Sequence, residues 1–276
     1  MKHNDSNKVL TKELNKDSNQ KKTGIKQRLY VSVVLTLIAL VAITAATVAW
    51  FSIADNTKVN TMALDIVTDV EMRMDLDPHS TIDQYVRTLS FEAIANRIQS
   101  EKGFSVANTP LEPVTTNDCM IFRYEDGSIV KSDSGAYLEF TLHFMAAKDM
   151  IVHLTSANSS DDVSDGTSIG SNVPSLSQSM RISFTADGQT YIYDPGLGDT
   201  RSVSGTFATF GLPPESQMEL SDNNAMFTLK EGVNKPVKVH IWIEGTDPEC
   251  TDEIKKAEYS IKLRFSGTDM EGKPFS

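Results

Sequence analysis

The chain has 276 residues, 39% of them hydrophobic, and a formal net charge of −11 at pH 7. An acidic surface is repelled by phosphate groups, so the overall charge argues against nucleic acid as a partner. The length is sufficient for one sizeable folded domain in addition to shorter segments.

The first 29 residues differ from the rest of the chain in charge. Residues 1–29 hold eight Lys or Arg and three Asp or Glu, a net charge of +5, so the remainder carries −16. Large apolar residues are scarce in this tail, and burial cannot offset its ordering entropy. We therefore predict a disordered basic tail. Because basic flanks stay in the cytoplasm, the tail is expected inside the cell.

An apolar run of 21 uncharged residues follows at 31–51. As a helix it would span roughly 30 Å, which matches the hydrocarbon thickness of a bilayer. Tyr30 stands before the run and Trp50 and Phe51 close it, as is typical of membrane interfaces. We predict a single transmembrane helix at 30–51, with the C-terminal part outside the cell and the membrane as a partner.

The same run has an alternative interpretation as an export signal that is removed. Small residues gather near its end at Ala45, Ala46 and Ala49, and a permissible cleavage site follows at Ala54. Signal peptides have an apolar core of about 7–15 residues, and the longer run here favours a retained anchor. The protein is thus expected either at the cell membrane or secreted after cleavage.

The only two cysteines, Cys119 and Cys250, both lie in the outside part. An oxidising compartment permits a disulfide bond between them. Such a bond would close a long loop, but the sequence does not show whether the two residues meet. Pairing and two free thiols both remain open.

Residues 57–276 are predicted to form one extracellular β-rich domain. Short stretches alternate apolar and polar residues, as strands with one buried face do. The Asp-Gly pairs at 126–127 and 187–188 predict hairpin turns. Many strands with turn signals between them favour a mainly β fold, a jelly-roll-like antiparallel β-sandwich. The predicted strands are residues 70–76, 137–144, 151–154, 180–184, 191–193, 225–229, 237–243 and 259–265.

A helical insertion is predicted at about 80–103. Ser80 or Thr81 can cap its start, apolar residues recur at helical spacing, and Gly103 ends it. Ser90 is a point at which the helix could divide. A second short helix is predicted at 251–257, and the Ser/Asp/Gly/Asn-rich residues 158–178 are predicted to form a loop.

Four stretches resemble the TasA/camelysin-like surface and biofilm-matrix proteins of Gram-positive bacteria. They are residues 46–52, 62–66, 137–144 and 239–250. The resemblance implies a jelly-roll domain, export, and assembly into extracellular fibres by strand exchange between neighbours. The helical insertion and the long basic tail depart from the family. The donor strand would comprise residues 57–66, with Thr57, Val59, Met62, Leu64 and Ile66 as its alternate side chains.

Camelysin-like proteins are described as metallopeptidases, so the histidines matter. None of the five forms the His-Glu-x-x-His motif of a zinc-binding helix. His143 and His153 lie in strand-like runs that would approach each other across a hairpin, which keeps a two-histidine zinc site with a carboxylate as an alternative. Ordinary strand histidines fit these scattered positions better. We expect no catalytic residue, metal or cofactor.

These patterns favour a non-enzymatic cell-surface or extracellular-matrix protein that acts through protein–protein contacts. Its expected partners are other copies, in an oligomer or fibre, and other surface proteins. A camelysin-like zinc metallopeptidase and a ligand-binding ectodomain are the alternatives. Trp242 alternates with Ile241 and Ile243, so it faces away from them, and we expect it in the core.

Overall fold

The computed structural model describes residues 32–36, 60–68, 71–157, 166–214, 220–254 and 257–275. The chain divides into two units, Met1–Asp55 and Asn56–Ser276. In the first unit only residues 32–36 are described, and they are helical. Within the described residues, no helix has the length and apolarity needed to cross a membrane. The predicted tail, most of the apolar run and Ala54 lie outside the described residues.

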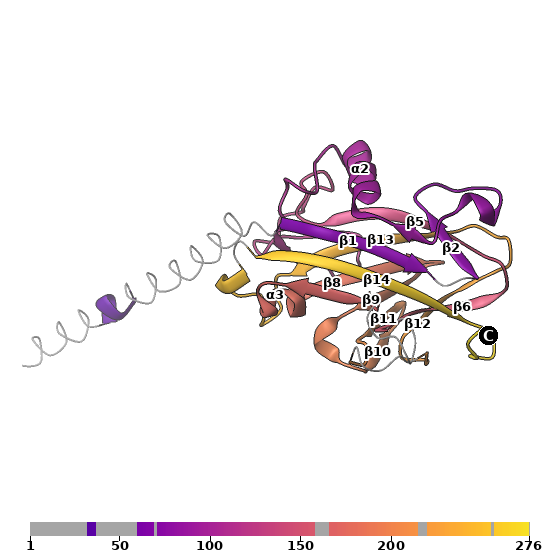
Figure 1. Ribbon diagram of the computed structural model, residues 1–276. Coiled ribbons are helices and arrows are strands. Elements are labelled where there is room, and N and C mark those ends of the chain that lie inside the picture. The colour runs from indigo at the N-terminus through magenta and orange to yellow at the C-terminus, as the bar shows by residue number, and fades with distance from the viewer. Residues whose placement is uncertain are drawn as a thin grey trace, which may run out of the picture. The chain divides into compact units, whose positions relative to one another are not determined.

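The second unit is mainly β, with two sheets and few helices. The six-stranded sheet has the order β12-β6-β14-β1-β3, and β7 also pairs with β14. Figure 1 shows β1 and β14 running side by side across the domain. The strands of this sheet are β1 Asn60–Thr68, β3 Thr88–Leu89, β6 Met150–Leu154, β7 Ser168–Ser171, β12 Ala225–Leu229 and β14 Glu258–Thr268.

The eight-stranded sheet has the order β10-β11-β9-β8-β13-β5-β2, and β4 also pairs with β13. Its strands are β2 Met72–Asp75, β4 Pro113–Val114, β5 Leu138–Ala146, β8 Met180–Ala186, β9 Gln189–Tyr193, β10 Arg201–Ser204, β11 Phe207–Phe210 and β13 Lys235–Glu244. The described helices of this second unit are α2 Phe91–Lys102, α3 Pro174–Ser179 and three 3₁₀ turns, η1 Ile82–Gln84, η2 Pro195–Leu197 and η3 Asp252–Ile254.

The two sheets pack face to face around one apolar core. Aromatic contacts join them: Phe265 on β14 packs against Phe144 on β5 and Phe184 on β8, with ring centroids 5.2 and 5.5 Å apart. A second, smaller cluster lies on the other face of the eight-stranded sheet. Its buried members are Val114, Cys119, Phe122, Val130, Ala136, Tyr137 and Trp242. Trp242 is therefore buried, as predicted, although in this second cluster.

The mainly β prediction is confirmed, and each of the eight predicted strand segments contains a strand. The hairpin at 187–188 is also confirmed, since β8 and β9 pair antiparallel across Asp187 and Gly188, which both have positive φ. At 126–127 the hairpin is held only by isolated bridges and turn hydrogen bonds. The sheets are not purely antiparallel, because β1–β14, β9–β11 and β4–β13 pair in parallel.

Two secondary-structure predictions need correction. Residues 80–103 are not one helix, because the η1 turn, strand β3 and α2 follow one another there. Ser90 begins α2 by accepting a hydrogen bond from the Ala93 amide, and Gly103 ends it with φ of 84°. The described part of the predicted loop at 158–178 contains strand β7 and most of α3. The predicted helix at 251–257 is the short η3 turn.

Candidate assembly interface at strand β1

Strand β1 is the first strand of the folded domain, and its two edges are covered unequally. On one edge it pairs in parallel with β14, from Asn60 opposite Glu258 to Thr68 opposite Phe265. On the other edge, strand pairing is confined among the described residues to Ile66 and Val67, opposite β3. The main-chain attachment of β1 therefore comes almost entirely from the C-terminal strand.

Strand β14 is the centre of the six-stranded sheet. Its first half pairs with β7 and its second half with β6 on the edge away from β1. Tyr259, Ile261, Leu263 and Phe265 are buried. Loss of β1 would leave β14 with a long unpaired edge, and such an edge readily accepts another strand.

The predicted donor-strand residues fall in and before β1. Met62, Leu64 and Ile66 belong to the strand, while Thr57 and Val59 lie outside the described residues. Residues 69–71 alone connect β1 to β2, which belongs to the other sheet. The connection between the two sheets at this point is thus short.

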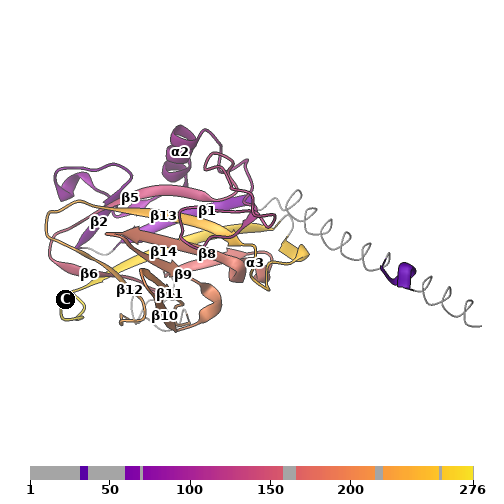
Figure 2. The same cartoon turned by 180° about the vertical axis from the view of Figure 1, so that it is seen from behind.

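Helix α2 lies beside β1 and β5, as both Figure 1 and Figure 2 show. Ile94 and Ile98 are fully buried in the main core. Arg97 pairs with Asp77, and Lys102 Nζ lies 2.6 Å from Glu139 Oε1 on β5. The helix is therefore attached to the sandwich by apolar burial and by two ion pairs.

Glu139 also belongs to a polar row across three adjacent strands of the eight-stranded sheet. His240 on β13 stands opposite both Glu139 on β5 and Ser183 on β8. His240 Nε2 lies 3.1 Å from Glu139 Oε2, and its Nδ1 lies 3.4 Å from Ser183 Oγ. The pKa of Glu139 is lowered to about 2, mainly by its hydrogen bond with His240 and also by its hydrogen bond with Lys102. Burial of the carboxylate acts in the opposite direction but is outweighed.

The polar row resembles a serine–histidine–carboxylate relay in its residue types, but its setting is structural. Ser183 and His240 are buried, and the rings of Phe122 and Tyr137 lie 5.3 and 6.0 Å from the His240 ring. Ser183 lies in the middle of β8, whose main chain is paired on both sides. A nucleophile needs access to substrate and free donors for the oxyanion, which this position does not offer.

His143 and His153 do not come together. His143 is on β5 in the eight-stranded sheet, and its Nδ1 lies 3.1 Å from Asn234 Oδ1. His153 is on β6 in the other sheet, and both of its ring nitrogens have partners, Asn224 and Thr268. The alternative of an approach across a hairpin is wrong, because β5 and β6 belong to different sheets. Among the described residues, no group of three or more His, Cys, Asp or Glu is arranged to hold a metal ion.

The two cysteines are free thiols, so the bond that the sequence left open is not formed in the structure. Cys119 is buried in the second cluster, whereas Cys250 packs against the edge of the main core. Burial raises the pKa of Cys119 to about 11 and that of Cys250 to about 12. Both thiols are therefore expected to be poor nucleophiles at neutral pH.

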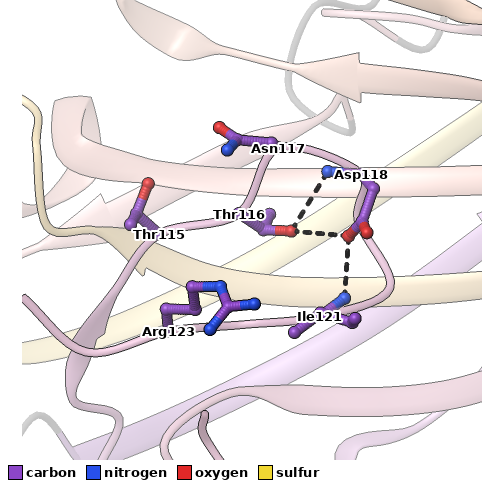
Figure 3. Close-up of a pocket in the computed structure, with 6 residues that line it drawn as sticks. All are labelled: Thr115, Thr116, Asn117, Asp118, Ile121 and Arg123. Carbon is purple, nitrogen blue, oxygen red and sulfur yellow. Dashed lines mark hydrogen bonds between the residues drawn. The ribbon is translucent and has the colours of Figure 1, made fainter. Parts of the chain in front are cut away.

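A small polar hollow of about 140 Å³ lies at the hairpin that covers the second cluster (Figure 3). Asp118 Oδ1 accepts hydrogen bonds from the amides of Met120 and Ile121, each at 2.8 Å, and from Thr116 Oγ1. These bonds, with that from Ile121 first, lower the pKa of Asp118. The polar groups that line the hollow are thus largely hydrogen-bonded to one another, as they are in a turn.

No protein-family model, curated protein or solved structure matches this chain. The sequence patterns and the geometry therefore carry the functional argument. The sequence predicted a strand within residues 57–66 but neither its parallel partner nor the attachment of α2. The alternation in residues 137–144 and 237–243 does place Glu139 and His240 away from the main core. Their contact required the strand register, which no local pattern contains.

Proposed function

We propose that the protein is a non-enzymatic bacterial surface or extracellular-matrix protein of the TasA/camelysin-like kind. Its β domain would be a jelly-roll-like sandwich, either held at the membrane by residues 30–51 or released after Ala54. It would act through protein–protein contacts in which β1 of one copy completes the sheet of another. The observation that carries this proposal is the placement of β1 between a long C-terminal strand and a two-residue edge strand.

The exchange requires no new recognition sequence, because the incoming strand is identical to the one that leaves. Main-chain hydrogen bonds to β14 would supply affinity, and alternate side chains such as Leu64 and Ile66 would fill the sites that the resident strand had occupied. Parallel pairing along residues 258–265 would fix the register of the incoming strand. The exchange thus uses contacts that the domain already makes.

The state of the N-terminus would decide which form exists. If the chain is cleaved near Ala54, β1 begins close to a free end and can leave its own sheet. If the anchor is retained, β1 stays tied to the membrane and in its own domain. One-way exchange would give a growing chain of copies, and reciprocal exchange would give a dimer.

The test compares a chain that begins at Asp55 with one that lacks residues 55–68. We expect filaments from the first, seen by electron microscopy, and no polymer from the second. The shorter chain should bind a synthetic peptide of residues 57–68. A matched peptide with proline in place of Leu64 should bind much more weakly, because proline removes a main-chain donor and disfavours pairing.

The decisive negative result is a monomer. If the chain from Asp55 has a β-type circular dichroism spectrum and stays monomeric at high concentration, strand exchange is wrong. A tethered or secreted single domain would then remain.

A further inference from the structure

We propose that β3 and α2 form a clamp, residues 88–102, which sets the rate at which β1 is exchanged with that of a second copy. The inference rests on the proposed strand exchange and names its regulation. It also gives a role to the helical insertion, which departs from the family that the sequence resembles.

The clamp lies on the edge of β1 that faces away from β14. Thr88 and Leu89 pair with Val67 and Ile66 of β1. Ser90 then begins α2, which runs on beside β1 and β5. Strand β1 thus has β14 along one edge, and on the other edge it is paired with the clamp at Ile66 and Val67.

The clamp is fixed to parts of the sandwich other than β1. Ile94 and Ile98 are at most 1% exposed and belong to the main core. Lys102 is tied to Glu139 on β5, and Glu139 is held in turn by His240 on β13. Arg97 is tied to Asp77, which follows β2. All four attachments lead to the main core or to the eight-stranded sheet, so the clamp is held by contacts that do not involve β1.

To leave, β1 must break its pairing with the clamp as well as its pairing with β14. The clamp can make the same contacts to a β1 strand that comes from another copy, since the two strands are identical. Its contacts therefore stabilise the closed monomer and the exchanged form alike. A looser clamp should raise the rate of exchange while changing the final extent little.

The first experiment compares two buried isoleucines with the same chemistry. Ile98→Ala loosens α2, whereas Ile182→Ala creates an equivalent cavity in β8, away from the clamp. Exchange is followed by uptake of a fluorescent peptide of residues 57–68 into the chain that begins at Asp55. We expect uptake by Ile98→Ala to be about tenfold faster than by Ile182→Ala, with final uptake within about twofold.

The second experiment needs no destabilised variant. A zero-length carbodiimide reagent should join Lys102 Nζ to the Glu139 carboxylate, which lie 2.6 Å apart. This amide bond locks the clamp, and we expect peptide uptake to slow at least about tenfold. Lys102→Arg is the matched control, because it keeps the ion pair but offers no amine to couple.

The outcomes separate the two proposals. If no variant takes up peptide or assembles, strand exchange is wrong, and the clamp proposal, which depends on it, is wrong too. If the unmodified protein exchanges but Ile98→Ala and Ile182→Ala do so at equal rates, and the cross-linked protein is not slowed, exchange stands and the clamp is wrong. If carbodiimide treatment slows peptide uptake by the Lys102→Arg protein equally, the effect comes from other sites and the clamp proposal is again wrong.

Discussion

In its second half, strand β13 is buried on both faces, but by different means. Val237, Val239, Ile241 and Ile243 point to the main core and have no exposed surface. On the opposite face His240 and Trp242 are 1% and 2% exposed. The inner face is covered by the other sheet, and the outer face by the hairpin that carries Cys119, Phe122 and Val130.

The difference shows what each kind of cover demands of the side chains. An apolar face needs only shape and volume, since it has no polar atoms to satisfy. The outer face carries polar groups that lose water on burial, so each needs a partner. Trp242 Nε1 donates to Glu244 at 3.0 Å, and His240 has partners at both ring nitrogens. Truncation should therefore act through cavities on the inner face and through unpaired polar groups on the outer face.

The largest loss of stability is expected from Phe140→Ala, on the face of the eight-stranded sheet that points to the main core. Phe140 on β5 is 1% exposed and belongs to the main core. Removal of a buried phenyl ring leaves a cavity, and we expect the free energy of unfolding to fall by about 3–5 kcal/mol. Urea denaturation of the domain measures this change.

The neighbouring residue provides the control for that cavity. Thr141 follows Phe140 on the same strand and points to the outer face, where it is half-buried. Thr141→Ala should change the free energy of unfolding by less than about 0.5 kcal/mol. Equal losses at both positions would contradict the assignment of the two faces.

A somewhat smaller loss of stability is expected from Arg181→Met, on the opposite, outer face of the same sheet. Arg181 stands opposite Trp242 and pairs with Asp194, at 3.1 Å, and with Asp247; all three side chains are at most 13% exposed. Its removal leaves two buried carboxylates without their cation, and we expect a loss of about 3 kcal/mol at pH 7. Burial already raises the pKa of Asp194, so the loss should shrink as the pH falls and this carboxylate is protonated.

An exposed ion pair supplies the comparison for Arg181. Lys230 Nζ lies 2.6 Å from Asp149 Oδ2, but both side chains are largely exposed. Lys230→Met should cost at most about 1 kcal/mol. A loss for Arg181→Met no greater than this, or one that is the same at pH 4 and pH 7, would show that burial does not govern the outer-face cluster.

Strand segments were predictable because one face of each strand meets an apolar core. The period of two in residues 137–144 and 237–243 places Phe140 and Ile241 inward, and the structure confirms it. Strands β7 and β10 were missed because residues 168–171 and 201–204 are short and mostly polar, without alternation. The helical spacing in residues 80–103 was right only for Ile94 and Ile98, which lie in α2. Earlier in this stretch Leu89 belongs instead to strand β3, which pairs with β1.

The candidate interface was predictable only in part. The sequence predicted a strand within residues 57–66, but its parallel pairing with β14 joins residues almost 200 positions apart. The same limit applies to His240 and Glu139, which lie 101 residues apart in sequence. The sequence also left open whether Cys119 and Cys250 pair, because their separation depends on the same long-range packing. In the structure they belong to different apolar clusters. Long-range register is set by the whole core, and no local motif contains it.

The smallest effect concerns the Lys102–Glu139–His240 row, which joins the outer face to α2. The pKa of Glu139 is lowered from 4.5 to about 2, first by the hydrogen bond with His240 and then by that with Lys102. A carboxylate with a depressed pKa in the folded state contributes stability that is complete above its unfolded pKa. That contribution is lost as the pH falls from about 4.5 towards 2.

Glu139→Gln tests this contribution by removing the ionisable group while keeping its size. The variant should have a lower free energy of unfolding than the unmodified protein at pH 6. This difference should narrow steadily between pH 4.5 and 2. Urea denaturation at each pH measures it. Glu125→Gln is the control, because burial and Asp126 raise the pKa of Glu125. As the pH falls, the unmodified protein should therefore gain stability relative to Glu125→Gln, whereas it should lose stability relative to Glu139→Gln. A Glu139→Gln gap that stays constant over this range would mean that His240 and Lys102 do not hold Glu139 ionised.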